Sequence, residues 1–406
     1  MHWDCKRDIR IEATPDLHGP SPVSLRRRGR RPWLAGLALL GVGCGPDPIE
    51  PCDGDCGGEG PFPTIIEAGE HIVTDSLWQI ETPLEILPGA TLRLGPNASI
   101  LAHGNVQARG TADRPITFTW LEEGRPWGAF VLFQAASDGS RFAHCIFEHG
   151  TGASVDTNSY AGMLSIYNAE AEIEDCVIRY KPEQGDGINV RSGWARIARC
   201  EFDFCDDAVD FDDSGGTITG CIFRNTQNDA IDLGAESDVT CSGNEIYDSL
   251  DKGISLGERS RGTLENNIIV GCEIGIAIKD GSDPLVINNT LWGNNVGIAA
   301  YHKSGAPAGG HGQVVNTIVW ASDSLNVSVD SLSTTQFRYS CIEGDREGEG
   351  NVDADPLLVD PSAGDFHIQG ASPCVDSGAE AGAPALDFEG DPRPRGQGWD
   401  IGADEA

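Results

Sequence analysis

The chain has 406 residues, with 63 Asp and Glu against 28 Lys and Arg, and its formal net charge is −35. Such an acidic excess repels nucleic acid and anionic lipid headgroups, so neither is expected as a partner, whereas divalent cations suit it. No apolar run reaches the 18 or more residues that span a bilayer, so no mature transmembrane helix is predicted.

Residues 1–43 are predicted to be a signal region. A basic segment at 26–31 is followed by a short apolar run at 33–42 and then by Cys44. This order resembles bacterial lipoprotein signals, in which the cysteine is lipidated and becomes the first mature residue. The resemblance implies export and a lipid anchor on Cys44 at the outer membrane or cell surface. Leu40 lies four residues before the cysteine, where that family prefers three, and the alternative is an ordinary signal peptide.

Two segments flank this signal. Residues 1–22 do not fit a signal peptide, so translation is expected to start near Val23 or Leu25. Residues 44–65 are rich in Gly and Pro and are predicted to form a flexible tether.

Internal repetition dominates the sequence after the tether. One series of similar tripeptides advances in steps of 21, 22, 23, 22 and 22 residues, starting at 187, 208, 230, 253, 275 and 297. A second series has nearly the same period, and its members begin at Cys145, Cys176, Cys200, Cys221, Asn244, Asn267, Asn289 and Asn316. Within each repeat, short apolar alternations are broken by Gly, Asn and Asp, which indicates strands and turns rather than helices.

Each repeat is therefore predicted to form one coil of a solenoid. A single coil cannot bury its apolar face, so coils stack about 4.8 Å apart, and each strand pairs with its counterpart. Asn side chains should bond to one another along the stack, and Cys should fill the same slot as free thiols. The pattern resembles the pectin-lyase-like family, which implies an all-β, right-handed parallel β-helix with coils of about 22 residues over residues 66–345.

The C-terminal residues 346–406 resemble the choice-of-anchor Q module, which follows the β-helix in many secreted proteins. The resemblance rests on the segments 364–368, 372–378, 387–393 and 400–405. In that family a variable surface anchor often comes next, and here the N-terminal lipid would replace it. Cys341 and Cys374 would either pair to lock the module onto the last coil or remain free thiols.

An acidic cluster is predicted on the outer side of the repeated strands, because alternation along a strand decides which side chains face outward. The outward columns carry Asp207 and Asp210 on one coil and Asp229 and Asp232 on the next. Like charges about 5 Å apart repel by on the order of 1 kcal/mol even when solvated. Clustered carboxylate oxygens suit Ca²⁺, so a calcium site is predicted at these four residues. The alternative is a solvated acidic face.

Two lysines lie next to these acids, Lys252 one coil beyond Asp229 in the same column and Lys279 one coil further in the outward column two residues on. Calcium-dependent polysaccharide lyases of the pectin-lyase-like fold use a Lys or Arg beside the calcium as base, and this resemblance makes both lysines candidate catalytic residues. Alternatively, Lys252 offsets Asp229 or Asp251 and Lys279 offsets Asp280.

Three functions are compatible with these features. The favoured one is an exported, surface-anchored monomer that binds a polysaccharide, a cell-surface glycan or a partner surface, with Ca²⁺ stabilising the central coils. The second is a calcium-dependent lyase acting on uronate-containing glycans, and the third is a spacer or adhesin without activity. A hydrolase using Asp206, Asp207 and Asp229 is a weaker enzymatic alternative. Trp127, Trp292 and Tyr301 are candidate sugar-stacking or packing residues.

Overall fold

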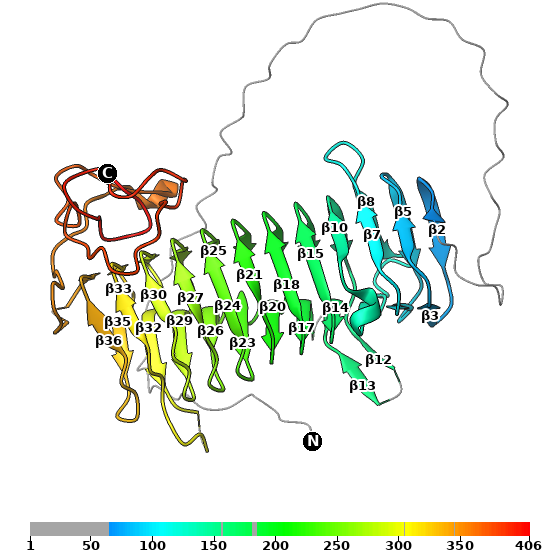
Figure 1. The fold of residues 1–406 in the computed structure, drawn as a ribbon, viewed down its shortest axis with the longest axis horizontal. Helices are drawn as coiled ribbons and strands as arrows, with labels where there is room; N and C mark the ends of the chain where they lie inside the picture. Colours follow the sequence, from blue (N-terminus) through cyan, green and yellow to red (C-terminus); the bar gives the residue numbers. More distant parts are fainter. Residues whose placement is uncertain (1–64, 156, 181–184, 304, 345) are drawn as a thin grey trace, which may run out of the picture. The chain divides into compact units, whose positions relative to one another are not determined.

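The computed structural model describes residues 65–406 apart from 156, 181–184, 304 and 345, so the signal region, Cys44 and nearly all of the tether lie outside the described residues. Each coil contributes three short strands, and each strand pairs in parallel with its counterpart in the next coil, which produces three long sheets (Figure 1). The predicted all-β solenoid is confirmed. None of the helices described is of a length and apolarity that would let it span a membrane.

Sheet A has twelve strands: β1 (Ile65–Ile66), β4 (Leu84–Ile86), β7 (Val106–Arg109), β10 (Ser140–Ala143), β15 (Glu170–Glu174), β18 (Trp194–Ala198), β21 (Gly215–Thr219), β24 (Asp238–Ser242), β27 (Arg261–Glu265), β30 (Leu285–Ile287), β33 (Gln313–Val315) and β36 (Gln336–Arg338). Sheet B has twelve strands: β2 (Gly69–Val73), β5 (Ala90–Leu94), β8 (Ile116–Trp120), β11 (Cys145–Glu148), β16 (Val177–Arg179), β19 (Glu201–Asp203), β22 (Ile222–Arg224), β25 (Glu245–Tyr247), β28 (Ile268–Val270), β31 (Thr290–Trp292), β34 (Ile318–Trp320) and β37 (Cys341–Ile342).

Sheet C has eleven strands: β3 (Leu77–Ile80), β6 (Ser99–Ala102), β9 (Phe130–Phe133), β14 (Gly162–Tyr167), β17 (Asp186–Arg191), β20 (Asp207–Asp212), β23 (Ile231–Gly234), β26 (Lys252–Leu256), β29 (Ile274–Lys279), β32 (Val296–Tyr301) and β35 (Leu325–Val329).

One continuous apolar core fills the interior of the solenoid, from Ile66 to Ile342. Side chains at the same position of successive coils stack, because the coils lie about 4.8 Å apart. The rings of Phe118 and Phe147 stack with their centroids 4.5 Å apart, and those of Phe202 and Phe223 are 4.7 Å apart. Burial of this apolar surface supplies the main favourable free energy of the fold.

The turn between sheets A and B carries the predicted ladder of Cys and Asn side chains. Asn244 Oδ1 accepts the backbone N–H of Cys221 at 3.0 Å, and Asn267 Oδ1 accepts that of Asn244 at 3.0 Å. The amides also bond to each other, with Asn267 Nδ2 donating to Asn289 Oδ1 at 2.9 Å. In the thiol part of the ladder, the backbone N–H of Cys200 donates to Cys221 Sγ at 3.4 Å.

The C-terminal end of the ladder differs from the prediction by one residue. The register pairs Thr290 with Ile318, so Thr317 follows Asn289 in the ladder instead of Asn316. Asn316 lies in the neighbouring column, and its side chain exchanges hydrogen bonds with the backbone of Ala379. Two adjacent polar residues fit the repeat equally well, and only strand pairing distinguishes them.

The cysteines of the coils are buried free thiols, as predicted for Cys145, Cys176, Cys200 and Cys221. Cys341 and Cys374 are also free thiols in the structure, and both lie in the apolar cluster beneath the C-terminal segment. Cys341 and Cys374 were expected either to form a disulfide or to remain free, and in the structure they are free.

The C-terminal residues fold back against the outer face of sheet B (Figure 1). Strands β38 (Leu358–Asp360) and β39 (Asp365–Ile368) pair antiparallel across the 3-10 turn η2 (Pro361–Ala363). Phe366 lies in the apolar cluster that joins this segment to Ile318 of the coils. The C-terminal segment therefore shares an apolar core with the side of the β-helix.

In the N-terminal third of the solenoid, a hairpin inserted between β9 and β14 covers the outer face of sheet C. It consists of β12 (Ala153–Val155) and β13 (Asn158–Tyr160), and a short 3-10 turn, η1 (Ala135–Ser137), precedes it in the chain. Tyr160 of the hairpin packs in an apolar cluster with Tyr167 of sheet C. The hairpin therefore covers the outer face of sheet C in the early coils. The polar part of that face begins in the coils that follow the hairpin.

Candidate functional site

The polar centre of the sheet C outer face contains the residues predicted to bind calcium. The strand register aligns one outward column as Asn189, Asp210, Asp232, Ser255, Ala277 and Ala299. The neighbouring column begins with Asp186 opposite Asp207 and ends with Lys252 opposite Ile274 and then Val296. The repeat alignment therefore predicted the neighbours along the sheet correctly.

Hydrogen bonds connect these side chains from coil to coil. Asp207 Oδ1 accepts the backbone N–H of Asp229 at 2.7 Å, and Asp210 Oδ2 accepts Asn189 Nδ2 at 2.7 Å. Asp229 Oδ1 in turn accepts the backbone N–H of Lys252 at 3.1 Å. Asn189 is 2% exposed, and its Oδ1 has no hydrogen-bond partner among the residues that the structure describes. A buried amide oxygen without a donor is an available cation ligand.

Burial and mutual repulsion shift the acids toward their neutral forms. Burial, followed by repulsion from Asp229, raises the pKa of Asp207 well above its ordinary value. Burial, followed by repulsion from Asp186, does the same to the pKa of Asp210. Burial and the charge of Asp232 raise the pKa of Asp229 to about 6. The folded chain therefore holds several carboxylates in a place that disfavours their charge.

Both predicted catalytic lysines lie against this acidic centre. Lys252 Nζ forms ion pairs with Asp229, at 3.3 Å, and with Asp251. Lys279 Nζ donates to Ser255 Oγ at 2.5 Å, and this contact replaces the alternative pairing with Asp280. Burial alone would lower both lysine pKa values, but the neighbouring aspartates raise them, so both amines are held in the charged form.

The outward columns are much less exposed than the alternation suggested. Lys279 is 2% exposed and Ala277 is fully buried. Ala277 lies in an apolar cluster with Ile274 and Ala299, and Tyr301 packs against that cluster. Because neighbouring coils are about 4.8 Å apart, long side chains cover the short ones beside them. The expectation that these positions face water is therefore wrong for this part of sheet C.

The four predicted metal ligands lie together on one face, but they do not close around a point. Within the described part of the chain, the only set of three His, Cys or carboxylate donor atoms within 4.8 Å of one another is at His367, Glu389 and Asp404. A cation at Asp207, Asp210, Asp229 and Asp232 would therefore require side-chain rotation. The sequence alone does not predict the histidine cluster, because its members come from three separate segments without a repeat.

Two further members of the acidic site, Asp186 and Asn189, were not among the predicted ligands. The signal was available, since they occupy the two aspartate columns one coil earlier. Of the candidate sugar-stacking residues, Trp127 is fully buried and Trp292 packs against the cluster beneath the C-terminal segment, whereas Tyr301 remains half-buried beside the site.

Comparisons with known proteins agree with this architecture. The family model "Right handed beta helix region" matches residues 161–319. The solved structure of pectate lyase Pel9A is similar with a TM-score of 0.51 and 13% identity, covering 78% of this chain and 88% of that chain. The periplasmic alginate epimerase AlgG is similar with a TM-score of 0.42 and 15% identity, covering 68% and 78%.

No curated protein matches the chain. At 13% identity, the likeness to pectate lyase Pel9A shows a common fold and nothing finer. Together, the parallel sheets and the family match identify the chain as a right-handed parallel β-helix, the fold that it shares with that pectate lyase.

Proposed function

We propose that the chain is an exported β-helix that binds an acidic polysaccharide on sheet C, with Ca²⁺ held by Asp207, Asp210, Asp229 and Asp232. Export and anchoring through a lipid on Cys44 belong to this proposal and rest on the signal sequence. The observation that carries the proposal is the crowding of half-buried and buried carboxylates whose pKa values are raised in the folded chain.

Charge counting on this face supports a divalent ion. Five aspartates, including Asp186, face two lysines across adjacent coils. The lysines reach only part of the cluster, since Lys252 pairs with Asp229 and Lys279 donates to Ser255. A Ca²⁺ ion would relieve the remaining repulsion, and Asn189 Oδ1 offers it a neutral oxygen ligand. An ion held by carboxylates from successive coils also has coordination positions left for the carboxylate of a uronate.

A sign test separates a calcium site from a solvated acidic face. If calcium binds, Asp232→Asn should lower the melting temperature in calcium, because it removes a ligand from the folded state only. If the face binds no ion, the same substitution should raise the melting temperature, because it removes a repulsive charge. Asp238→Asn is the matched control, since Asp238 is an exposed acid of the same coil in sheet A.

The expected result is a calcium-dependent rise in the wild-type melting temperature that Asp232→Asn reduces and Asp238→Asn keeps. Calorimetry should detect binding of polygalacturonate or alginate only in the presence of calcium. Asp232→Asn should abolish this binding. An unchanged wild-type melting temperature, together with a stabilised Asp232→Asn variant, would contradict the calcium site.

The second candidate is a lyase, which the position of the lysines favours. Lys252 and Lys279 lie on the acidic face, where a neutral amine could remove the proton next to a uronate carboxylate. In the metal-free chain both amines are held charged by the aspartates. A calcium ion would cancel part of the charge that raises the lysine pKa values, so any activity should require calcium.

The lyase test is the appearance of ultraviolet absorbance from unsaturated products when the protein acts on uronate polysaccharides with calcium. If the protein is a lyase, it should form unsaturated product, and Lys279→Gln or Lys252→Gln should reduce the rate. Calcium should still raise the melting temperature of these variants. Calcium-dependent binding without product would leave the glycan-binding function and exclude the lyase for the substrates tested.

A further inference from the structure

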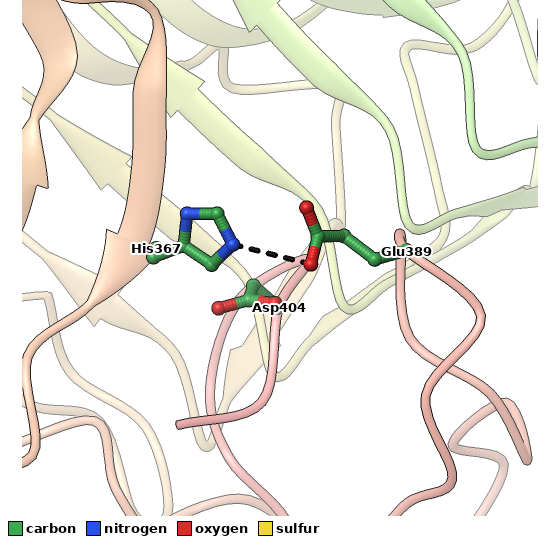
Figure 2. Close-up of side chains that lie close together, drawn as sticks. All are labelled: His367, Glu389 and Asp404. Carbon is green, nitrogen blue, oxygen red and sulfur yellow. Dashed lines mark ion pairs between the residues drawn. The ribbon is translucent and has the colours of Figure 1, made fainter. Parts of the chain in front are cut away.

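Three side chains meet on the C-terminal segment, well outside the sheet C site. His367 belongs to β39, Glu389 lies in the loop that follows Phe388, and Asp404 is two residues from the last residue of the sequence. Their donor atoms all lie within 4.8 Å of one another. Figure 2 shows the His367 ring facing Glu389, with Asp404 beside this pair, and His367 Nε2 is 3.2 Å from Glu389 Oε2.

The His367 ring is oriented by a fourth residue. Asp365 Oδ1 lies 2.6 Å from His367 Nδ1, so the aspartate fixes one ring nitrogen. The other nitrogen, Nε2, is then directed toward Glu389 (Figure 2). A carboxylate on one ring nitrogen and a ligand position on the other is the arrangement that orients histidines in metal sites.

Asp404 provides an independent indication of a cation site. The residue is only 7% exposed, and its Oδ2 has no hydrogen-bond partner among the described residues. A buried carboxylate oxygen without a donor is costly, because it has lost water and gained nothing. A carboxylate oxygen of Asp404 lies within 4.8 Å of the donor atoms of His367 and Glu389, so a cation among the three could satisfy this carboxylate.

From this geometry we infer that His367, Glu389 and Asp404 bind a divalent transition-metal ion, with Zn²⁺ as the best match. One imidazole nitrogen and two carboxylate oxygens are a zinc-type ligand set, whereas Ca²⁺ prefers oxygen ligands throughout. Three protein ligands leave a fourth position for water. Water can reach it, since His367 and Glu389 are exposed and Glu389 borders a surface cavity of about 450 Å³.

The consequence of such a site is a clasp between distant parts of the C-terminal segment. The ligands would tie the β38–β39 hairpin to the 387–391 loop and to the chain end near Asp404. The competing explanation is an ion pair, in which a protonated His367 satisfies Asp365 and Glu389 without any metal. The two explanations differ in whether zinc binding depends on His367.

The test is calorimetric titration of the full chain with Zn²⁺, in saturating Ca²⁺ to occupy other acidic sites. Removing His367 or Glu389, both exposed, should leave the fold intact, so His367→Gln and Glu389→Gln should each lose one zinc-binding event. Asp365→Asn should weaken it by about 10- to 100-fold, because it leaves the ligands but frees the ring. His302→Gln is the matched control, since His302 also contacts an aspartate, Asp330, but belongs to no such three-ligand set among the residues that the structure describes.

A second measurement does not depend on counting sites. Zinc should slow carboxypeptidase digestion from the C-terminus in the wild type and in His302→Gln, but not in Glu389→Gln or the buried isostere Asp404→Asn. Zinc binding and protection that are identical in all variants, or absent from the wild type, would overturn the metal site and leave the ion pair. Neither result bears on calcium at sheet C.

Discussion

Asp229 shows how one side chain can be both structurally connected and electrostatically unfavourable. Its Oδ1 accepts the backbone N–H of Lys252 and forms an ion pair with the same residue's amine. Burial and the charge of Asp232 nevertheless outweigh these contacts and raise the pKa to about 6. The carboxylate is therefore retained where the fold alone would prefer a neutral group, a condition found in binding sites and in structural ion-pair networks.

The raised carboxyl pKa values predict an unusual pH dependence in the metal-free protein. The folded pKa of Asp229, about 6, exceeds the unfolded value of about 3.9, so this group's stabilising contribution is fully present below about pH 4 and is lost as the pH rises through 6. The same sign holds for Asp210. In chelator, the wild type should therefore gain stability relative to Asp210→Asn as the pH falls from neutral to mildly acidic values.

Denaturant unfolding of the wild type and Asp210→Asn across this range is the measurement. The variant keeps an oxygen for the Asn189 amide, so its fold should be preserved. Excess calcium should reverse the wild-type trend, because protons then compete with the ion. A difference in unfolding free energy between the wild type and Asp210→Asn that stays constant with pH would contradict a raised pKa for Asp210.

At the scale of one structural element, the ladder between sheets A and B explains the sequence repeat. Each ladder side chain accepts the backbone N–H of the previous coil, and both Cys and Asn can do so. The amide does more, since Asn267 Nδ2 also donates to Cys241 O at 2.9 Å and to Asn289 Oδ1 at 2.9 Å. Buried turns thereby satisfy backbone groups that would otherwise have no partner.

Substitution in the ladder should separate these two roles. Asn267→Ala leaves the backbone N–H of Asn244 and the backbone carbonyl of Cys241 without their partner, at about 1–3 kcal/mol for each buried group. Asn267→Cys should cost less, because sulfur can still accept the N–H as it does at Cys221. Chemical denaturation measures both variants. Equal losses would show that sulfur at this position does not replace the amide oxygen as an acceptor.

For the whole molecule, the contact between the C-terminal segment and the coils is polar as well as apolar. Asn266 donates to Leu386 O at 2.8 Å, and Asn288 donates to Asp400 O and Gly402 O at 3.1 Å each. Asn316 continues this column with its bonds to Ala379. A second asparagine column, on the outside of the same turns, thus fastens the segment to the β-helix.

One buried ion pair should control this attachment. The side chains of Arg393 and Glu405 are fully buried and 2.8 Å apart, and Arg393 also donates to Asn266 Oδ1 at 3.2 Å. Arg393→Met would leave Glu405 buried and unpaired, which costs about 3–5 kcal/mol. We expect the C-terminal segment to become sensitive to proteolysis while the coils, which have their own core, stay folded.

Arg395→Met is the control for this prediction, because Arg395 forms only an exposed ion pair with Asp391, worth about 0–1 kcal/mol. Mass spectrometry of the protected fragment distinguishes loss of the segment from general unfolding. Equal protease resistance of the two variants would show that the apolar cluster around Phe366 holds the segment without the ion pair.

The sequence by itself determined the solenoid, its coil length and the neighbours along sheet C. This was possible because stacking places residues one period apart in contact, so that a one-dimensional repeat carries three-dimensional information. The columns through Asp210 and Asp232 and the ladder through Asn244 and Asn267 were read from spacing alone.

The tertiary structure determined the features that do not repeat along the sequence. Burial of Ala277 depends on long neighbours that cover it, and the choice of Thr317 over Asn316 in the ladder depends on strand register. His367, Glu389 and Asp404 meet only because the C-terminal segment folds back on itself. Contacts between segments of different type leave no mark on sequence spacing, so packing alone brings these donor atoms together.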